Sequence, residues 1–177
     1  TSTHKGCIFF GPRRKLLLEY KGDGIVRVRD IKNLPLFFEP SAHIIGRVVR
    51  AVIGDDLRLA YVIVETEHLD RGMVNAEDLV VTPEAVIIQD LDSIKSYQHG
   101  EELSVYEKKI GDRIYDGQGK EIGTVSDFIL SDDQKVSDIE VSTGVLSDIL
   151  QGRSQIPIDQ VHWKSFTSGL IEKQGSD

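Results

Sequence analysis

Two stretches of the chain share one pattern of hydrophobic and polar positions. Residues 42–67 (AHIIGRVVRAVIGDDLRLAYVIVETE) align without a gap on residues 119–144 (GKEIGTVSDFILSDDQKVSDIEVSTG) after a shift of 77 positions. In both stretches, apolar residues alternate on either side of a polar turn, which is typical of two strands joined as a hairpin. The repeat therefore predicts two similar β-hairpins, each at the centre of a duplicated small domain.

The segments around the hairpins predict further short strands. The triplet RIY at 113–115 precedes the turn DGQG, and an Asp-Gly pair is a strong turn signal. Residues 155–163 (QIPIDQVHW) resemble residues 73–81 (MVNAEDLVV), with an offset that has grown to 82. Gly46 and Gly123 stand at matching positions at the start of each hairpin, where we expect a bulge or a close approach between backbones.

The rest of the chain predicts one more hairpin and little helix. IVRVR at 25–29 alternates cleanly and is predicted to pair with residues 14–20 across the turn KGDG. Helical turns are predicted at 91–97 and 145–151, and a strand at 103–106. The sequence therefore predicts an all-β protein with one or two short helical turns. Its expected divisions are an N-terminal hairpin plus barrel over 1–92, a connector over 93–102 and a second barrel over 103–177.

The second copy resembles the PRC-barrel family. The resemblance rests on residues 109–141 (KIGDRIYDGQGKEIGTVSDFILSDDQKVSDIEV) followed by QIPIDQV at 155–161, which have the family's order of Gly-x-Val-x-Asp, two strands and an Ile-Pro strand. The first copy, residues 30–81, departs from this order, because Arg50 replaces the Asp and Val74-Asn75 replaces Ile-Pro. The resemblance implies two small PRC-type β-barrels in tandem.

The same resemblance implies a scaffold rather than an enzyme. Relatives include the cytoplasmic domain of the photosynthetic reaction centre H subunit and the C-terminal domain of the ribosome maturation factor, and most members use the barrel to bind other proteins. No catalytic residue belongs to the family motif. We therefore expect a non-enzymatic adaptor or assembly factor, with a membrane-bound or photosynthetic complex as a candidate setting. The alternatives are an RNA-binding or ribosome-maturation protein and a small-ligand-binding regulator, because a fold alone does not assign a function.

Composition agrees with a globular protein that needs no cofactor. The chain has 177 residues, a mean hydropathy of −0.19 and a single cysteine, Cys7. Its apolar runs are far shorter than the roughly 20 residues of a membrane helix. A lone thiol suits a reducing compartment, so we expect a cytoplasmic location, with the cytoplasmic face of a membrane complex as an alternative. No motif indicates a catalytic, cofactor or metal site.

Charge is unevenly distributed along the chain and suggests where a partner would bind. Residues 1–50 carry ten Lys/Arg and four Asp/Glu, a net +6, whereas residues 51–177 carry eleven and twenty-five, a net −14. The basic N-terminal strands and the aromatic run LPLFF give the candidate interaction residues Arg13, Arg14, Lys15, Arg27, Arg29, Phe37 and Phe38. The alternatives are a solubilising sheet face for the cations and core filling for the phenylalanines.

The nature of the partner is less determined than its binding face. An acidic protein, an anionic lipid surface or RNA could each meet these cations. RNA is disfavoured, because the chain is acidic overall and no aromatic residues are interleaved with the cations for base stacking. A protein partner is the main expectation. Homo-oligomerisation and peripheral membrane association remain open.

Overall fold

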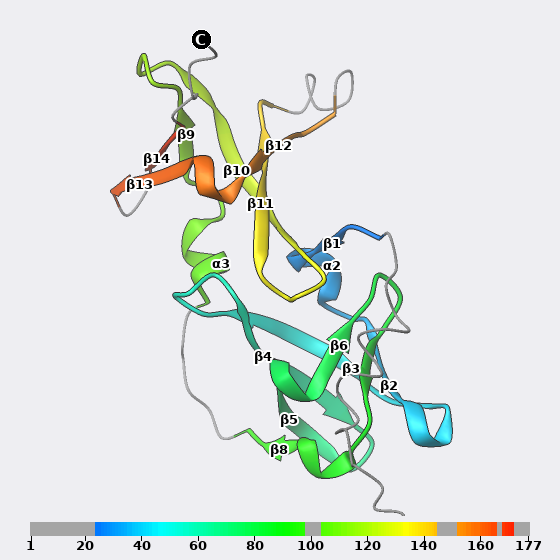
Figure 1. The fold of residues 1–177 in the computed structure, drawn as a ribbon. Helices are drawn as coiled ribbons and strands as arrows, with labels where there is room; N and C mark the ends of the chain where they lie inside the picture. Colours follow the sequence, from blue (N-terminus) through cyan, green and yellow to red (C-terminus); the bar gives the residue numbers. More distant parts are fainter. Residues whose placement is uncertain (1–23, 98–103, 145–151, 166–167, 172–177) are drawn as a thin grey trace, which may run out of the picture.

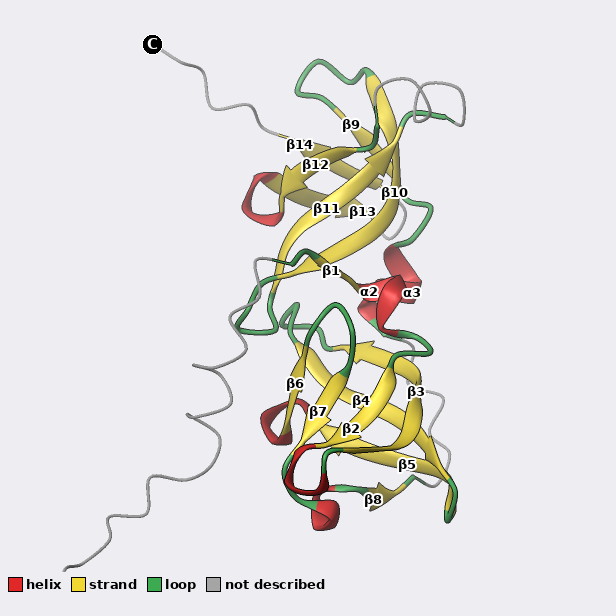
Figure 2. Cartoon of the chain, turned by 90° about the vertical axis from the view of Figure 1, so that its right-hand side faces the viewer, coloured by secondary structure: helices red, strands yellow, loops and turns green. Residues whose placement is uncertain are grey.

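The computed structural model describes residues 24–97, 104–144, 152–165 and 168–171, and these form two curled β-sheets stacked end to end (Figures 1 and 2). The chain is mostly β, with two short α-helices and several single 3-10 turns among the described residues. The sequence prediction of a β-rich protein is confirmed at this level. No helix within the described residues combines the length and apolar character needed to cross a bilayer.

The N-terminal sheet has the strand order β6-β7-β2-β3-β4-β5-β8. Its strands are β2 (Pro35–Phe38), β3 (His43–Ile53), β4 (Leu59–Thr66), β5 (Leu69–Asn75), β6 (Leu79–Val81), β7 (Val86–Ile88) and β8 (Lys95–Ser96). Three 3-10 turns connect them: η1 (Glu39–Ser41), η2 (Ala76–Asp78) and η3 (Leu91–Ser93). All neighbours are antiparallel except β2 and β7, which run parallel.

The C-terminal sheet has the strand order β12-β11-β10-β9-β14-β13, with β1 added beside β10. Its strands are β1 (Val26–Arg27), β9 (Arg113–Tyr115), β10 (Glu121–Leu130), β11 (Val136–Ser142), β12 (Ser154–Pro157), β13 (Val161–Ser165) and β14 (Ser168–Ile171). The turn η4 (Ile158–Gln160) joins β12 to β13. Here too one neighbouring pair, β9 and β14, is parallel.

The two central hairpins pair in the same register after the shift of 77 residues. The coinciding pairs are Val48–Val64 with Val125–Val141, Arg50–Ile63 with Asp127–Glu140, Ala51–Val62 with Phe128–Ile139, Val52–Tyr61 with Ile129–Asp138, and Ile53–Leu59 with Leu130–Val136. The irregularities in the ladder also fall at matching positions, between the first and second and the fourth and fifth of these pairs. Bulges at matching positions bend both hairpins in the same way.

Local sequence explains why the second hairpin forms where it does. Alternation places Val125 and Val141 opposite each other in the core, with 1% and 0% of their surfaces exposed. The turn closes when Ser131 N donates to the Lys135 carbonyl oxygen and Gln134 N donates to the Ser131 carbonyl oxygen, both at 2.8 Å. The predicted strand–turn–strand pattern is confirmed.

Glycine is required where β10 passes β11. A Cβ built on Gly123 would overlap the carbonyl oxygen of Ser142, and a Cβ on Gly46 would overlap that of Glu65. The close approach between backbones that the sequence predicted at both positions is confirmed. No larger residue fits there without moving a neighbouring strand.

Two predicted strands are corrected. The strand predicted over residues 25–29 ends at Arg27, and α2 (Val28–Ile31) begins at the next residue. Val26 on β1 and Val28 on α2 are nevertheless both buried. The strand predicted at 103–106 is a helix over its described part, α3 (Val105–Lys109). The strand that would pair with IVRVR and the helix at 145–151 lie outside the described residues.

The division of the chain also differs in detail from the prediction. The predicted connector, residues 93–102, contributes β8 to the N-terminal sheet, where it pairs with β5. The helical turn predicted at 91–97 is confined to η3, and β8 follows it. At the other end, β1 precedes the N-terminal sheet in sequence but pairs with β10 of the C-terminal sheet. The C-terminal sheet therefore includes a strand from the segment that precedes the N-terminal sheet in sequence.

Candidate interaction site: an ion-pair network between the two sheets

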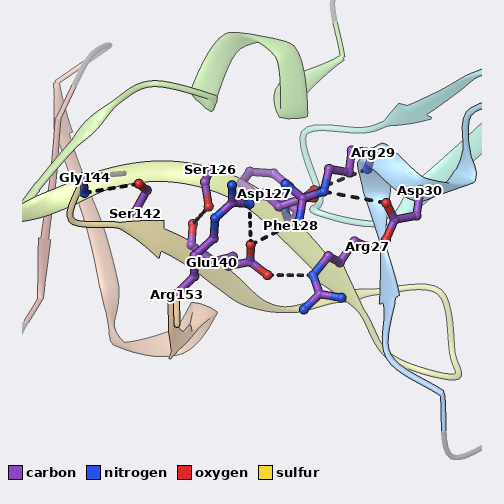
Figure 3. A network of polar contacts seen from close by, with 10 residues as sticks. All are labelled: Arg27, Arg29, Asp30, Ser126, Asp127, Phe128, Glu140, Ser142, Gly144 and Arg153. Atoms are coloured by element: carbon purple, nitrogen blue, oxygen red, sulfur yellow. Dashed lines mark hydrogen bonds and ion pairs between the residues drawn. The ribbon is translucent and has the colours of Figure 1, made fainter. Parts of the chain in front are cut away.

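Two of the predicted interaction residues, Arg27 and Arg29, point at carboxylates of the C-terminal sheet (Figure 3). The backbone places them there, because Val26 and Arg27 pair with Leu130 and Ile129 of β10. Arg27 is the last residue of β1 and Arg29 lies in the first turn of α2, so both guanidinium groups reach the same face of β10 and β11.

Glu140 on β11 is the centre of the network. Its side chain is only 2% exposed and meets three guanidinium groups: Arg27 Nε lies 2.6 Å from Oε2, and Arg29 Nη2 and Arg153 Nη1 lie 3.3 Å and 2.9 Å from Oε1. Both carboxylate oxygens are therefore engaged by cations, two from the segment of β1 and α2 and one from the residue before β12. A buried carboxylate is tolerated only with such pairing.

Asp127 on β10 is fully buried and has a different set of partners. Arg29 Nε lies 3.0 Å from Oδ2, and the backbone N–H groups of Arg29 and Phe128 donate to Oδ1 at 3.3 Å and 2.8 Å. The Asp127 Oδ2 atom has no hydrogen bond of good geometry, although it is close to the guanidinium. This carboxylate thus has the smaller electrostatic compensation of the two.

The pKa values of the two carboxylates are shifted in opposite directions. Burial raises the pKa of Asp127 above its ordinary value, and the backbone N–H groups and the Arg29 charge only partly oppose that effect. Burial would also raise the pKa of Glu140, but the hydrogen bonds from Arg27 and Arg153 outweigh it and lower the pKa. Burial likewise raises the pKa of the neighbouring Tyr106 hydroxyl. Pairing, rather than catalytic activation, explains the state of Glu140.

A second set of contacts joins the sheets at the tips of their hairpins. Leu59 N donates to the Gln134 carbonyl oxygen at 2.9 Å, and Val136 N donates to the Leu57 carbonyl oxygen at 2.8 Å. Between these bonds, Arg58 forms an antiparallel bridge with Lys135. The shift of 77 residues relates Leu59 to Val136 and Leu57 to Gln134, so it converts each of these two hydrogen bonds into the other. The two turns therefore meet as the two sides of a two-fold interface do.

The helices repeat this reciprocity. α2 packs against β10 of the C-terminal sheet, and α3 packs against β3 of the N-terminal sheet. The buried Ser104, which precedes α3, accepts a hydrogen bond at Oγ from Ile53 N of β3 at 2.8 Å. An ion pair joins Arg50 of β3 to Glu107 of α3. The acid lies on the helix in this contact and on the strand in the Arg29–Asp127 contact, so the two contacts have opposite polarity.

The other predicted interaction residues are placed differently. Phe37 and Phe38 lie on β2 and are half-buried, with Phe38 packed against the core. Phe37 lies opposite Ile44, which is 68% exposed, at one end of the N-terminal sheet. Core filling accounts for Phe38, while a partner role for Phe37 stays a prediction. Arg13, Arg14 and Lys15 lie outside the described residues.

Arg27 and Arg29 therefore have an intramolecular role, and their part in binding a partner stays a prediction. Their side chains are 31% and 41% exposed, but their charges are held by intramolecular carboxylates. Sequence reasoning missed Glu140 and Asp127, although a signal was present: Glu140 stands between Ile139 and Val141, and Asp127 directly precedes the apolar run at 128–130. Such a residue is tolerated in a core only when the fold brings a counter-charge to it.

This network of ion pairs joins two segments of the chain to the C-terminal sheet. Guanidinium groups keep their protons, and both buried carboxylates are occupied by them. No group of three or more potential metal-ligating side chains gathers anywhere in the part of the chain that the structure describes. The network therefore attaches β1 and α2 to the C-terminal sheet.

Comparison with known proteins agrees with this architecture in the second half of the chain. Residues 105–171 match the family described as the PRC-barrel domain. The match begins at α3 and ends with β14, so it covers every strand of the C-terminal sheet except β1. The chain contains one such domain match. No curated protein matches the chain.

Proposed function

We propose that the chain is a tandem of two PRC-type barrels that works as a non-enzymatic, protein-binding adaptor or assembly factor. The observation that carries the proposal is the coincidence of register between the two hairpins after a shift of 77 residues. Strand order coincides as well, since β6-β7-β2-β3-β4-β5 follows the same path as β13-β14-β9-β10-β11-β12. The N-terminal sheet would then be a second barrel whose sequence has diverged.

The unmatched sequence of the N-terminal sheet has a physical explanation. The family's Asp position is occupied by Asp127 in the second copy and by Arg50 in the first. Arg50 pairs with Glu107, whereas Asp127 pairs with Arg29, so the exchanged charge serves the contact between the two barrels. Divergence of the first copy would follow from its pairing with the second. With Asp at both positions, Glu107 would face a carboxylate in place of Arg50.

The positions of the buried charged side chains support an adaptor role. The buried carboxylates Asp127 and Glu140 hold α2 and β1 in place, and the resemblance of residues 105–171 to the PRC-barrel family implies no catalytic residue. A membrane-bound or photosynthetic complex remains the proposed setting, and a cytoplasmic location remains part of the proposal. The partner is expected to be a protein.

Affinity capture from a lysate of the native organism, followed by reconstitution with the purified partner, tests the proposal. The useful variant is Arg13→Glu with Arg14→Glu, because reversing Arg27 or Arg29 would place like charges against Glu140 and Asp127 and damage the fold. A defined complex that reforms from purified components supports an adaptor, and its loss in the variant assigns the docking face to the N-terminal cations. Retention only of ribosomal material that ribonuclease removes would contradict the proposal.

A further inference from the structure

The outer face of the N-terminal sheet carries a row of apolar side chains. Strands β6, β7, β2 and β3 lie side by side in this order (Figure 2). Their register pairs Val80 with Ile87, Ile87 with Phe37, and Phe37 with Ile44. Because residues that pair across strands point to the same face, these four side chains form one line across the sheet, which we call the apolar row.

The apolar row faces away from the core. The residues next to it on the same strands belong to the core or pack against it, and they are Leu79, Val81, Val86, Ile88, Leu36, Phe38 and Ile45. Side chains alternate along a strand, so the row points to the opposite face. Ile44 is 68% exposed there, but Ile87 is only 3% exposed. Since the outer face of such a sheet is otherwise solvated, this burial indicates that another part of the protein lies over Ile87.

The corresponding row of the C-terminal sheet is polar at both ends. In the same register, its positions are taken by His162, Leu170, Tyr115 and Glu121. His162 and Glu121 are exposed. The shared strand arrangement therefore does not itself require apolar side chains at these positions. Their presence in the N-terminal sheet alone indicates a contact that this sheet makes and the other does not.

The described chain begins beside the same strands. A Cβ built on Gly24 would overlap the ring of Pro83, so Gly24 passes directly over the turn between β6 and β7. Pro83 follows Val80 by three residues and precedes Ile87 by four. Residues 1–23 are therefore joined to the described structure close to one end of the apolar row.

The sequence before Gly24 has an apolar group within reach of the whole row. The run LLL at 16–18 precedes Gly24 by six to eight residues, which span about 20–26 Å when extended. The row begins about 10 Å from Pro83 and crosses three strand spacings, or about 14 Å. The other apolar group, IFF at 8–10, is 14 to 16 residues from Gly24. A longer tether makes closure less favourable, so the leucines are the better occupant.

We infer that Leu16, Leu17 and Leu18 dock on the apolar row, so that residues 15–20 (KLLLEY) form a strap over the outer face of β6, β7 and β2. A partner that used Phe37 would first have to displace the strap, which therefore controls access to this face. The contact lies within the chain and does not depend on an adaptor function. The hairpin predicted from sequence would instead place these residues beside β1, but β1 offers only two residues for pairing.

Nuclear Overhauser effects in the methyl-labelled full chain test the contact directly. We expect cross-peaks from the methyl groups of Leu16, Leu17 or Leu18 to the ring protons of Phe37 and the methyl groups of Ile87. Cross-peaks from the leucines to β1, cross-peaks to the row from residues 8–10 alone, or no cross-peaks would overturn the inference. In a mixture of two differently labelled chains, cross-peaks between chains would identify a second copy as the occupant and would also overturn it.

Matched variants identify which residues cover the row. Replacing residues 16–18 with serine should increase the relaxation of the Ile87 methyl groups by a soluble paramagnetic chelate, because the row becomes open to solvent. Replacing residues 8–10 with serine should leave that relaxation unchanged. Circular dichroism checks that both variants are folded. The reverse pattern, or an unchanged Ile87 in the first variant, would overturn the inference. If the first variant does not fold, the cross-peaks of the wild type decide the question.

Competition by a peptide shows whether the row is occupied in the wild type. A peptide with the sequence of residues 13–21 should bind saturably to the variant with serine at 16–18. It should bind the wild type at least about tenfold more weakly, because the tethered segment has the higher effective concentration. The same peptide with serine at 16–18 is the control and should bind neither protein. Equal binding of the unmodified peptide to both proteins, or no binding to the variant, would overturn the inference.

Discussion

At the scale of single residues, the fold depends on a few positions where the neighbouring backbone leaves room only for glycine. Gly46 and Gly123 were identified from their matching places in the repeat, and the structure gives the reason, since each passes a neighbouring carbonyl oxygen too closely for a Cβ. The partners of the charged residues could not be predicted in this way. Glu140 meets arginines 113, 111 and 13 positions away, and no local pattern encodes such separations.

Gly123→Ala should destabilise the chain by more than about 1 kcal/mol, because the added methyl group overlaps the Ser142 carbonyl oxygen. The matched control is Gly117→Ala. A Cβ on Gly117 meets only the Ile171 carbonyl oxygen at 4.0 Å, so that variant should keep or slightly raise the stability. Denaturant unfolding measures both. Equal stability of the two variants would contradict the close approach of β10 and β11.

Glu140→Gln should lower the free energy of unfolding at neutral pH by about 1–3 kcal/mol, because three arginines lose their shared charged acceptor. Asp127→Asn should lower the free energy of unfolding by less, because burial already disfavours the charged form of this carboxylate. Denaturant unfolding of the two variants and the wild type at pH 7 gives the comparison. A larger loss from Asp127→Asn would reverse the assigned roles.

The two carboxylates should also give opposite dependences on pH. The folded pKa of Glu140 is lowered from 4.5, so its stabilising contribution is complete above 4.5 and is lost as the pH falls through the folded pKa. The folded pKa of Asp127 is raised from 3.8, so its contribution is present below 3.8 and is lost as the pH rises through the folded pKa. Between pH 7 and pH 4, the cost of Glu140→Gln should therefore shrink and that of Asp127→Asn should grow. If the stability costs of the two substitutions changed in the same direction with pH, this account would be contradicted.

At the scale of elements, strands were predicted well and helices poorly. Alternation and turn residues identified the two central hairpins and the strand β9, because those signals are local. The same alternation was misleading at Val28, where a strand was predicted and α2 begins. Over so few residues, burial of Val26 and Val28 is compatible with either a strand or a short helix. Only the packing of α2 against β10 decides between them.

Ser104→Ala tests the contact between α3 and β3. Ser104 Oγ accepts from the Ile53 amide in a buried setting, so its removal leaves that N–H without this partner. We expect a loss of about 1–2 kcal/mol in the free energy of unfolding. The exposed Ser41→Ala serves as the control and should change little. If Ser104→Ala left the free energy of unfolding unchanged, the hydrogen bond would not hold α3 against β3.

At the scale of the whole molecule, the repeat in the sequence indicated two similar units but not how they meet. The N-terminal arginines were predicted to form an exposed docking face, and the sequence did not indicate that two of them also pair with carboxylates of the C-terminal sheet. Contacts related by the 77-residue shift join the hairpin tips, and the corresponding helices α2 and α3 pack against β10 and β3. Such an interface is invisible in a linear pattern, because every pair in it is long-range. The account therefore depends on the two sheets facing each other in this way.

The most direct test is the nuclear Overhauser effect between the α-protons of Arg58 and Lys135 in the full chain. The hydrogen bonds from Leu59 to Gln134 and from Val136 to Leu57 flank this pair, which makes it a non-hydrogen-bonded antiparallel pair with its Cα atoms about 4.5 Å apart. The account predicts a strong cross-peak between these two protons. Its absence, with both hairpins otherwise intact, would show that the two sheets do not meet at their turns.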